Sequence, residues 1–188
     1  MKKLALQNKK KKKSSPQKKS KSKILLKSIL VPTDFSAGAN KALQYALTFA
    51  KQFDAKIELM HVVEPMLFPS DSVFNQPVIQ PIFPSIDLEQ RKIDEEKLKS
   101  IVVEIKKEYS KISYYSTTGT PHEEVIEYIK NKKIDLIILA AHTQNKLEHF
   151  FFGSTTEKIM LKASCPVLIL HEDEKNFVKL KQTSHIAK

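Results

Sequence analysis

The residues best suited to bind a ligand lie between Leu136 and Leu170, where two apolar runs flank a polar loop. The first run, Leu136 to Ala141, is typical of a buried strand, and a helix is predicted to begin after the loop at Gly153-Ser154. In an open α/β sheet, a strand, a loop and a helix N-terminus present free backbone N–H groups where an anion can bind. We therefore predict the ligand site of this chain here.

The same helix start also has a purely structural interpretation. Ser154-Thr155-Thr156-Glu157 has the spacing of a capping box, in which the first side chain caps the helix and the glutamate reaches back to the backbone. A capping box and a bound phosphate would compete for the same N–H groups, so both interpretations stay open.

Asp34 is a second candidate because it directly follows a predicted strand. Strand ends are where ligands bind in such sheets. An aspartate in this place can equally stabilise a turn or the start of the following helix, which is the alternative interpretation.

Patterns typical of metal sites and of catalysis are not found in the sequence. His142 and His149 lie seven positions apart, and no carboxylate stands at a recognised metal-ligand spacing. Cys165 opens a buried strand, where cysteine is usually an inert small hydrophobe. The chain has only three glycines, too few for a Walker or dinucleotide-binding loop. We expect no catalytic residue, no metal site and no enzyme built for turnover.

The elements that position these residues alternate along the chain. Apolar runs predict five strands, and helical periodicity predicts four helices between them. The predicted strands are Ser28 to Val31, Ile57 to Val63, Ile112 to Thr118, Leu136 to Ala141 and Val167 to Leu170. The last two are almost entirely apolar, as expected of parallel strands buried on both faces. This order predicts an α/β fold with a single doubly wound, five-stranded parallel sheet flanked by four helices.

Three helix starts are predicted from local signals. Ser36 is the expected N-cap of the first helix, and the second begins near Asp87. Thr120-Pro121-His122-Glu123 predicts a capping box for the third. The buried stripe of the second helix is expected to consist of Ile93, Leu98, Ile101, Val102 and Ile105.

The net charge of +11 is concentrated in a tail. Twelve lysines and no acidic residue lie between Met1 and Lys27, and subtracting these 12 charges from +11 leaves −1 for the remainder. We expect residues 1–23 to be a disordered basic tail, either merely solvated or able to contact nucleic acid or anionic surfaces. Residues 24–171 are expected to form the α/β domain, with a Pro-rich loop at 64–86, and 172–188 a C-terminal tail.

The sequence favours a cytoplasmic protein that is not transmembrane. Ile24-Leu25-Leu26 is interrupted by Lys27 and is too short for a secretory signal, and no apolar stretch approaches the length of a transmembrane helix. The single Cys165 cannot form an internal disulfide and suits a reducing compartment.

The order of elements, together with a set of short motifs, resembles the universal stress protein family. The motifs are Val31-Pro32-Thr33-Asp34-Phe35-Ser36, Lys41-Ala42-Leu43, His61-Val62-Val63, Gly119-Thr120-Pro121, Gly153 to Lys158 and Cys165-Pro166-Val167-Leu168. The resemblance implies a Rossmann-like regulatory module of the stress response, any ATP hydrolysis being slow and incidental. It also implies a homodimer, often formed through the last strand, here Val167 to Leu170.

Family members that bind ATP carry a loop of the form Gly-x-x-Gly-x9-Gly-Ser/Thr. On this chain the first two glycines fall on Ala140 and Thr143, whereas Gly153 and Ser154 match, and His142 matches a histidine common between the first two glycines. A β-branched residue such as threonine at positive φ is unfavourable. We therefore expect binding of ATP or AMP to be weakened or lost.

By this resemblance the adenine-nucleotide site consists of residues at the strand ends and at the last helix start. They are Pro32, Thr33, Asp34, Val62, Ala140, His142, Thr143, Gly153, Ser154, Thr155 and Thr156. Asp34 is implied to lie near the base and ribose. Two alternatives remain: a nucleotide-independent dimeric interaction module, and a binder of nucleic acid or anionic surfaces driven by the tail.

Overall fold

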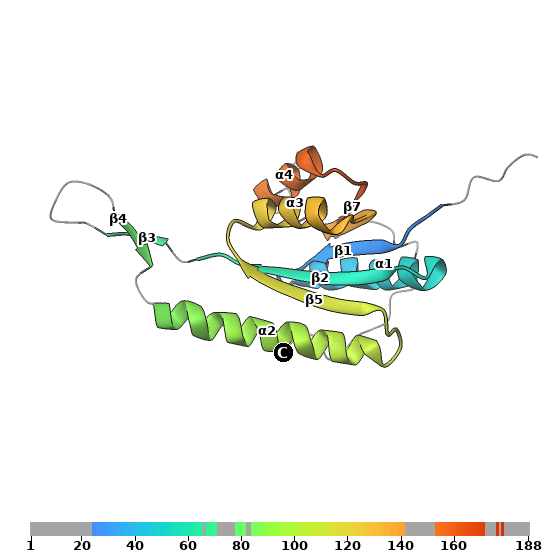
Figure 1. Cartoon of the computed structure of the whole chain (residues 1–188), viewed down its shortest axis with the longest axis horizontal. Helices are drawn as coiled ribbons and strands as arrows, with labels where there is room; N and C mark the ends of the chain where they lie inside the picture. The colour runs from blue at the N-terminus through green and yellow to red at the C-terminus, as the bar shows by residue number, and fades with distance from the viewer. Residues whose placement is uncertain are drawn as a thin grey trace, which may run out of the picture.

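The computed structural model of the chain describes residues 24–65, 67–70, 78–81, 84–141, 153–171, 176 and 178. Its main sheet has five parallel strands in the order β5-β2-β1-β6-β7 (Figure 1). These strands are β1 (Ser28–Pro32), β2 (Lys56–Val63), β5 (Ile112–Thr118), β6 (Leu136–Ala140) and β7 (Val167–Leu170). From β1 the chain adds β2 and β5 on one side and then β6 and β7 on the other, so the strand order reverses between β1 and β6, which is the topological switch point of a doubly wound fold.

Four helices cover the two faces of this sheet, as predicted. They are α1 (Ala37–Phe53), α2 (Pro84–Lys106), α3 (Pro121–Lys132) and α4 (Ser154–Lys162). Buried side chains of α1 and α2 share one core cluster, and those of α3 and α4 share the other, so each pair covers one face. Figure 1 shows α3 and α4 on one side of the strands and α2 on the other. The predicted fold class is confirmed.

The central strand β1 contributes side chains to both core clusters. Ile29 and Val31 pack in the cluster of α1 and α2, whereas Leu30 packs in the cluster of α3 and α4. Successive side chains of a strand point to opposite faces, so a fully apolar strand is required where both faces are covered. β7 differs because it lies at the sheet edge, and only Leu170 of this strand is buried. The expectation of burial on both faces is therefore wrong for β7.

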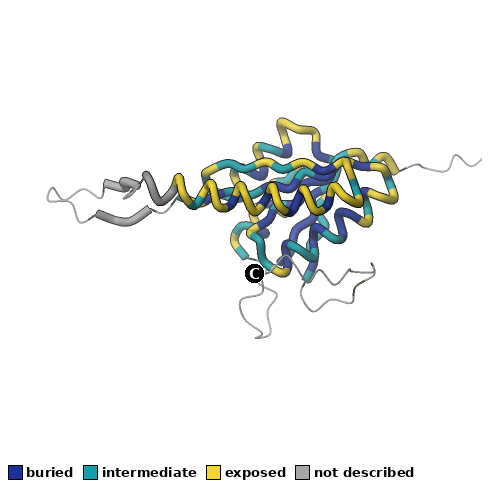
Figure 2. The backbone as a smooth tube through the Cα atoms, turned by 90° about the horizontal axis from the view of Figure 1, so that it is seen from below, coloured by how far each residue is buried: buried dark blue, intermediate teal, exposed yellow. Residues whose placement is uncertain are grey.

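The helix α2 differs from the prediction in its start and in its buried stripe. It begins at Pro84 instead of near Asp87. Ile93 is 43% exposed, and the buried position beside it is Asp94. The buried stripe of α2 therefore includes Asp94 in place of Ile93. A buried polar residue cannot be identified from apolar periodicity alone. Figure 2 shows the exposed outer side of α2 in front of the buried strands.

The segment predicted as a Pro-rich loop contains regular structure. β3 (Leu67–Ser70) and β4 (Val78–Pro81) pair antiparallel in a separate two-stranded sheet, and α2 begins within the segment. Pro69 and Pro81 lie in strands that each have one neighbour, the position in which a strand tolerates a residue without an N–H donor. The loop prediction is therefore wrong for these residues.

Only one of the three predicted side-chain caps is formed. The Ser36 hydroxyl accepts a hydrogen bond from the Ala39 backbone N–H at 3.1 Å, as expected of the N-cap of α1. Thr120 is the N-cap of α3, and its carbonyl accepts from the N–H groups of Glu123 and Glu124, but its side chain makes no cap hydrogen bond. Gly153 is the N-cap of α4, which places Ser154 inside the helix, where it cannot cap. The capping boxes predicted at these two helices are wrong.

The chain after β7 stays close to the first helix and its core cluster at the three described residues that follow the strand. The Lys41 ammonium donates to the His171 carbonyl at 2.7 Å, and the Tyr45 hydroxyl donates to Asn176 Oδ1 at 3.4 Å. Val178 packs against the core cluster of α1 and α2. Within the described residues, no helix is both long and apolar enough to cross a membrane.

Candidate functional site

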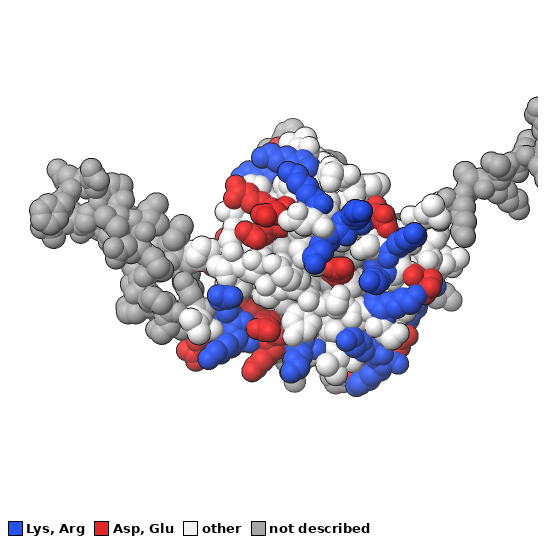
Figure 3. Space-filling view, in the orientation of Figure 1, with Lys and Arg blue, Asp and Glu red and all other residues white. Residues whose placement is uncertain are grey.

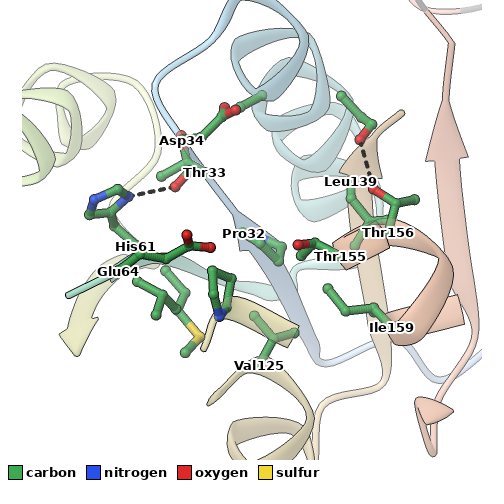
Figure 4. A pocket seen from close by; sticks show the side chains of 15 residues that line it. Pro32, Thr33, Asp34, His61, Glu64, Val125, Leu139, Thr155, Thr156 and Ile159 are labelled. Atoms are coloured by element: carbon green, nitrogen blue, oxygen red, sulfur yellow. Dashed lines mark hydrogen bonds between the residues drawn. The ribbon is translucent and has the colours of Figure 1, made fainter. Parts of the chain in front are cut away.

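A cavity of about 270 Å³ opens at the carboxyl ends of β1, β2 and β6, between the first turns of α3 and α4. This is the crevice at the switch point where ligands of doubly wound folds bind. The cavity is lined by Pro32, Thr33, Asp34, Ala39, Met60, His61, Val62, Glu64, Pro121, Val125, Leu139, Ala140, Thr155, Thr156 and Ile159. Figure 4 shows Asp34 and Glu64 on one side of it and the α4 threonines on the other.

Unequal strand lengths create one wall of this cavity. The last residue of β1 in register is Pro32, which pairs with Met60, whereas β2 continues to Val63 alongside β5. The Thr33 N–H still donates to the Met60 carbonyl at 2.8 Å, and the chain then leaves the sheet. The end of β2 therefore projects beyond β1 and presents His61, Val62 and the following Glu64 to the opening.

The turn from Thr33 to Ser36 is held by its own side chains. Thr33 Oγ1 accepts from the Phe35 N–H and Asp34 Oδ1 accepts from the Ser36 N–H, each at 3.0 Å. Phe35 has φ = 65°, which costs a residue with a side chain about 1–2 kcal/mol. Asp34 thus both lines the cavity and stabilises the turn, so its two predicted interpretations are compatible.

His61 fixes this turn from the neighbouring strand. Its Nδ1 lies 2.7 Å from the Thr33 carbonyl oxygen, which can only accept, so Nδ1 carries the proton. The Phe35 ring packs on the His61 ring with centroids 4.5 Å apart. Sequence reasoning matched His61 to a family motif but did not select it as a site residue; its signal was a polar side chain at the end of an apolar strand.

The opposite wall is formed by β6 and α4. The Thr156 hydroxyl donates to the Ala140 carbonyl at a long 3.5 Å (Figure 4). Gly38 lies against Ala140: a Cβ built on this glycine would be 2.8 Å from Ala140 Cβ. No side chain of the described residues caps α4, and the first N–H groups of a helix have no partner within it. An anion can therefore be accommodated at this helix start.

The structure brings most of the predicted residues into one cavity. Those that line it are Pro32, Thr33, Asp34, Val62, Ala140, Thr155 and Thr156. Gly153 and Ser154 begin α4 without lining the cavity that the described residues form. His142 and Thr143 lie outside the described residues. Sequence reasoning missed Glu64, Pro121, Val125 and Ile159, of which the last three reach the cavity from helices packed over the sheet.

The lining divides the cavity into parts of different chemistry. Met60, Val125, Leu139 and Ile159 form an apolar floor, and the ionisable side chains of the lining are the carboxylates of Asp34 and Glu64 and the imidazole of His61. Such a surface suits a flat, mostly apolar ring with hydroxyl groups that donate to a carboxylate, whereas phosphate fits only at the start of α4. Among the described residues, no group of three or more His, Cys, Asp or Glu side chains could hold a metal ion.

Comparisons with known proteins agree with this architecture. The family model described as "Universal stress protein family" matches residues 26–171. The universal stress protein MJ0531 of Methanocaldococcus jannaschii is 30% identical over 154 residues, which cover 80% of this chain and 85% of that protein.

Two solved structures share the fold over nearly their whole length. The structure of MJ0577 from the same organism is 27% identical with a TM-score of 0.59, covering 81% of this chain and 99% of the other. The universal stress protein UspA of Lactobacillus plantarum is 23% identical with a TM-score of 0.64, covering 79% and 99%. With the family model matching most of its length, the chain belongs to the universal stress protein family.

Proposed function

We propose that this chain is a cytoplasmic regulatory module of the stress response that binds an adenine nucleotide, AMP or ATP, with low affinity. The observation that carries the proposal is the cavity at the switch point, which has an apolar floor, a carboxylate at one side and a helix N-terminus at the other.

Each part of an adenine nucleotide has a counterpart in this cavity. The base would lie against Met60, Val125 and Leu139, and the ribose hydroxyls would donate to Asp34. The phosphate would accept hydrogen bonds from the first N–H groups of α4, beside Thr155 and Thr156. His142, Thr143, Gly153 and Ser154 remain proposed members of the site because of their place in the loop motif.

Two structures of related fold contain nucleotides. The universal stress protein of Archaeoglobus fulgidus in complex with dAMP is 18% identical with a TM-score of 0.54, covering 78% of this chain and 98% of the other. A universal stress protein in complex with cAMP is 17% identical with a TM-score of 0.51, covering 79% and 98%. At these identities the likeness concerns the fold alone, so the cavity itself supports the proposal.

Calorimetric titration of the full chain with AMP and with ATP tests the proposal. We expect saturable binding, and Asp34→Ala weakens it about tenfold because a hydrogen bond to a charged group is lost. Glu127→Ala is the matched control, since it removes the same charge from an exposed position of α3. If neither nucleotide binds saturably, the chain is instead a nucleotide-independent interaction module, and native protein would carry no copurified adenine nucleotide.

We also propose a homodimer formed through β7. The carbonyls of Pro166 and Leu170 accept from β6, so by alternation the N–H and C=O groups of Val167 and Ile169 point away from it. An apolar edge strand with such groups is a template for pairing with a second copy. Ile169→Pro removes one outward donor and should yield a monomer in sedimentation, whereas Ile169→Ala should remain dimeric.

The proposed module is regulatory, with no step of turnover assigned to any residue. Any ATP hydrolysis is expected to be slow and incidental. A phosphate-release assay with Asp34→Ala as the comparison tests this, since release that is fast and lost in this variant would contradict the assignment.

A further inference from the structure

A buried carboxylate lies behind the cavity on a helix that does not line it. Asp94 of α2 is only 5% exposed, and no described residue of α2 is among those lining the cavity. A carboxylate removed from water is costly unless charged or hydrogen-bonding partners surround it. The side chains that contact the Asp94 carboxylate therefore indicate which parts of the structure it holds in place.

Asp94 joins α2 to the strand that forms the cavity wall. Its Oδ2 accepts from Gln90 Nε2 at 2.9 Å and lies 3.5 Å from His61 Nε2, and its Oδ1 lies 3.3 Å from Lys97 Nζ. Gln90 and Lys97 lie on the same helix, whereas His61 belongs to β2. The contact with His61 is thus the one that leaves the helix.

His61 continues the chain of contacts to the cavity. Its Nδ1 donates to the Thr33 carbonyl at 2.7 Å, so one imidazole faces Asp94 with one nitrogen and the start of the Thr33–Ser36 turn with the other. The hydrogen bond from Nδ1 fixes the ring to the turn, and Nε2 lies close enough to Asp94 to form an ion pair when the ring is protonated, so the imidazole connects α2 to the turn.

The same turn is also held through the Phe35 ring. This ring lies 4.5 Å from the His61 ring and 5.2 Å from Lys97 Nζ, measured to the Phe35 centroid. The positive φ of Phe35 is a conformation that persists only where surrounding contacts over-determine it. His61 and Lys97, both linked to Asp94, supply these contacts.

We propose that Asp94 and His61 are positioning residues that hold the Thr33–Ser36 turn, and with it Asp34, in the ligand-binding conformation. The proposal rests on the proposed function for its effect on affinity, but it makes a separate claim about the free protein. α2, which covers the sheet outside the cavity, thereby controls the geometry of the site.

Asp94→Asn in the full chain tests this proposal, with Glu96→Gln as the matched control on the same helix. Glu96 is exposed, and the change removes the same charge. The first measurement, amide hydrogen exchange without ligand, follows the N–H groups of Phe35 and Ser36, which donate to Thr33 Oγ1 and Asp34 Oδ1. We expect exchange at these two amides to accelerate several-fold in Asp94→Asn, with β6 amides unchanged. Equal rates in Asp94→Asn and Glu96→Gln would overturn the proposal.

The second measurement is AMP affinity in a double-mutant cycle with Asp34→Ala. Asp94→Asn should weaken AMP binding about tenfold in the native background and have little further effect once Asp34 is removed, because it acts through that carboxylate. A loss that is equal in both backgrounds would show a general structural role and overturn the proposal.

Two further arms keep the outcome decisive. Should the native chain bind no AMP, the proposed function fails, and the exchange experiment alone decides the positioning role. Should Asp94→Asn not fold, Lys97→Gln replaces it, since Lys97 is exposed and its loss removes a contact with both Phe35 and Asp94. We expect the same two amides to accelerate to a smaller extent, and unchanged rates would contradict the role.

Discussion

Ala140 at the end of β6 lies directly against Gly38 in the first turn of α1. A Cβ atom built on Gly38 would be 2.8 Å from the Ala140 methyl carbon, closer than real Cβ contacts occur. The methyl group that stands in place of a loop glycine is therefore accommodated by the missing side chain of a residue distant in sequence. The absence of a side chain at Gly38 thus leaves space for the methyl group of Ala140.

We predict that Gly38→Ala lowers the free energy of unfolding by about 1–2 kcal/mol, because overpacking outweighs the gain in helix propensity. Combining it with Ala140→Gly should recover most of this loss. Urea unfolding of the four proteins of this cycle measures the coupling. Additive effects would show that the two residues do not compete for the same space.

Affinity for ATP is predicted to be weaker than low-micromolar because two glycines of the loop motif are replaced. Ala140→Gly combined with Thr143→Gly should tighten binding, since both changes remove side chains that restrict the backbone. Calorimetric titration with ATP compares the native chain with the double variant. Low-micromolar binding by the native chain would contradict this prediction.

Asp135 is predicted to stabilise the fold at the amino-terminal end of the strands, opposite the cavity. Its Oδ2 accepts from the backbone N–H groups of Lys27 and Ser28, at 2.8 and 3.0 Å, and so fixes the start of β1 beside β6. Asp135→Ala should cost about 1–3 kcal/mol of unfolding free energy. Asp135→Asn retains an oxygen acceptor and should cost less. In contrast to Asp34→Ala, neither change should alter nucleotide affinity beyond its effect on stability.

Tyr128 is predicted to make the protein lose stability in alkali. Burial, and then the hydrogen bond that its hydroxyl donates to the Glu58 carboxylate, raise the pKa of Tyr128 well above its usual value of 10.0. Above pH 10.0 the unfolded chain releases this proton while the folded chain keeps it, so stability present below that pH falls as pH rises.

The stability difference between the native chain and Tyr128→Phe should therefore shrink as pH is raised through 10.0. Urea unfolding at several alkaline pH values measures it. Glu58→Gln should weaken this pH dependence but not abolish it, because burial is the larger cause. A constant difference between the native chain and Tyr128→Phe would contradict the prediction.

Any binding to nucleic acid is predicted to depend on the N-terminal lysines. Acidic and basic side chains are interspersed on the described face in Figure 3, and the sequence after Lys27 carries a net charge of −1. Deleting residues before Ser22 should abolish binding to a DNA duplex, and added salt should weaken binding by the full chain steeply. Binding that survives the deletion would rule out the tail as its cause.

The order of the elements along the chain and most strand ends could be predicted from the sequence, because buried parallel strands are continuous apolar runs. The strand-end rule also identified Asp34 and Ala140, since it depends only on where strands stop. It could not identify Val125 or Ile159, whose side chains reach the cavity only after α3 and α4 pack on the sheet. Asp94 was missed for a related reason, because a buried polar residue interrupts the apolar period.

The cavity walls come from widely separated parts of the chain, from Pro32 in β1 to Ile159 in α4. During synthesis on the ribosome, β1 and β2 emerge early, but the other side of the cavity does not exist until α4 has been made and has docked. Incompletely synthesised chains would therefore be unable to bind the ligand at this site. A ligand at this site would stabilise only molecules that have completed their fold, which makes occupancy a measure of successful maturation as well as of ligand concentration.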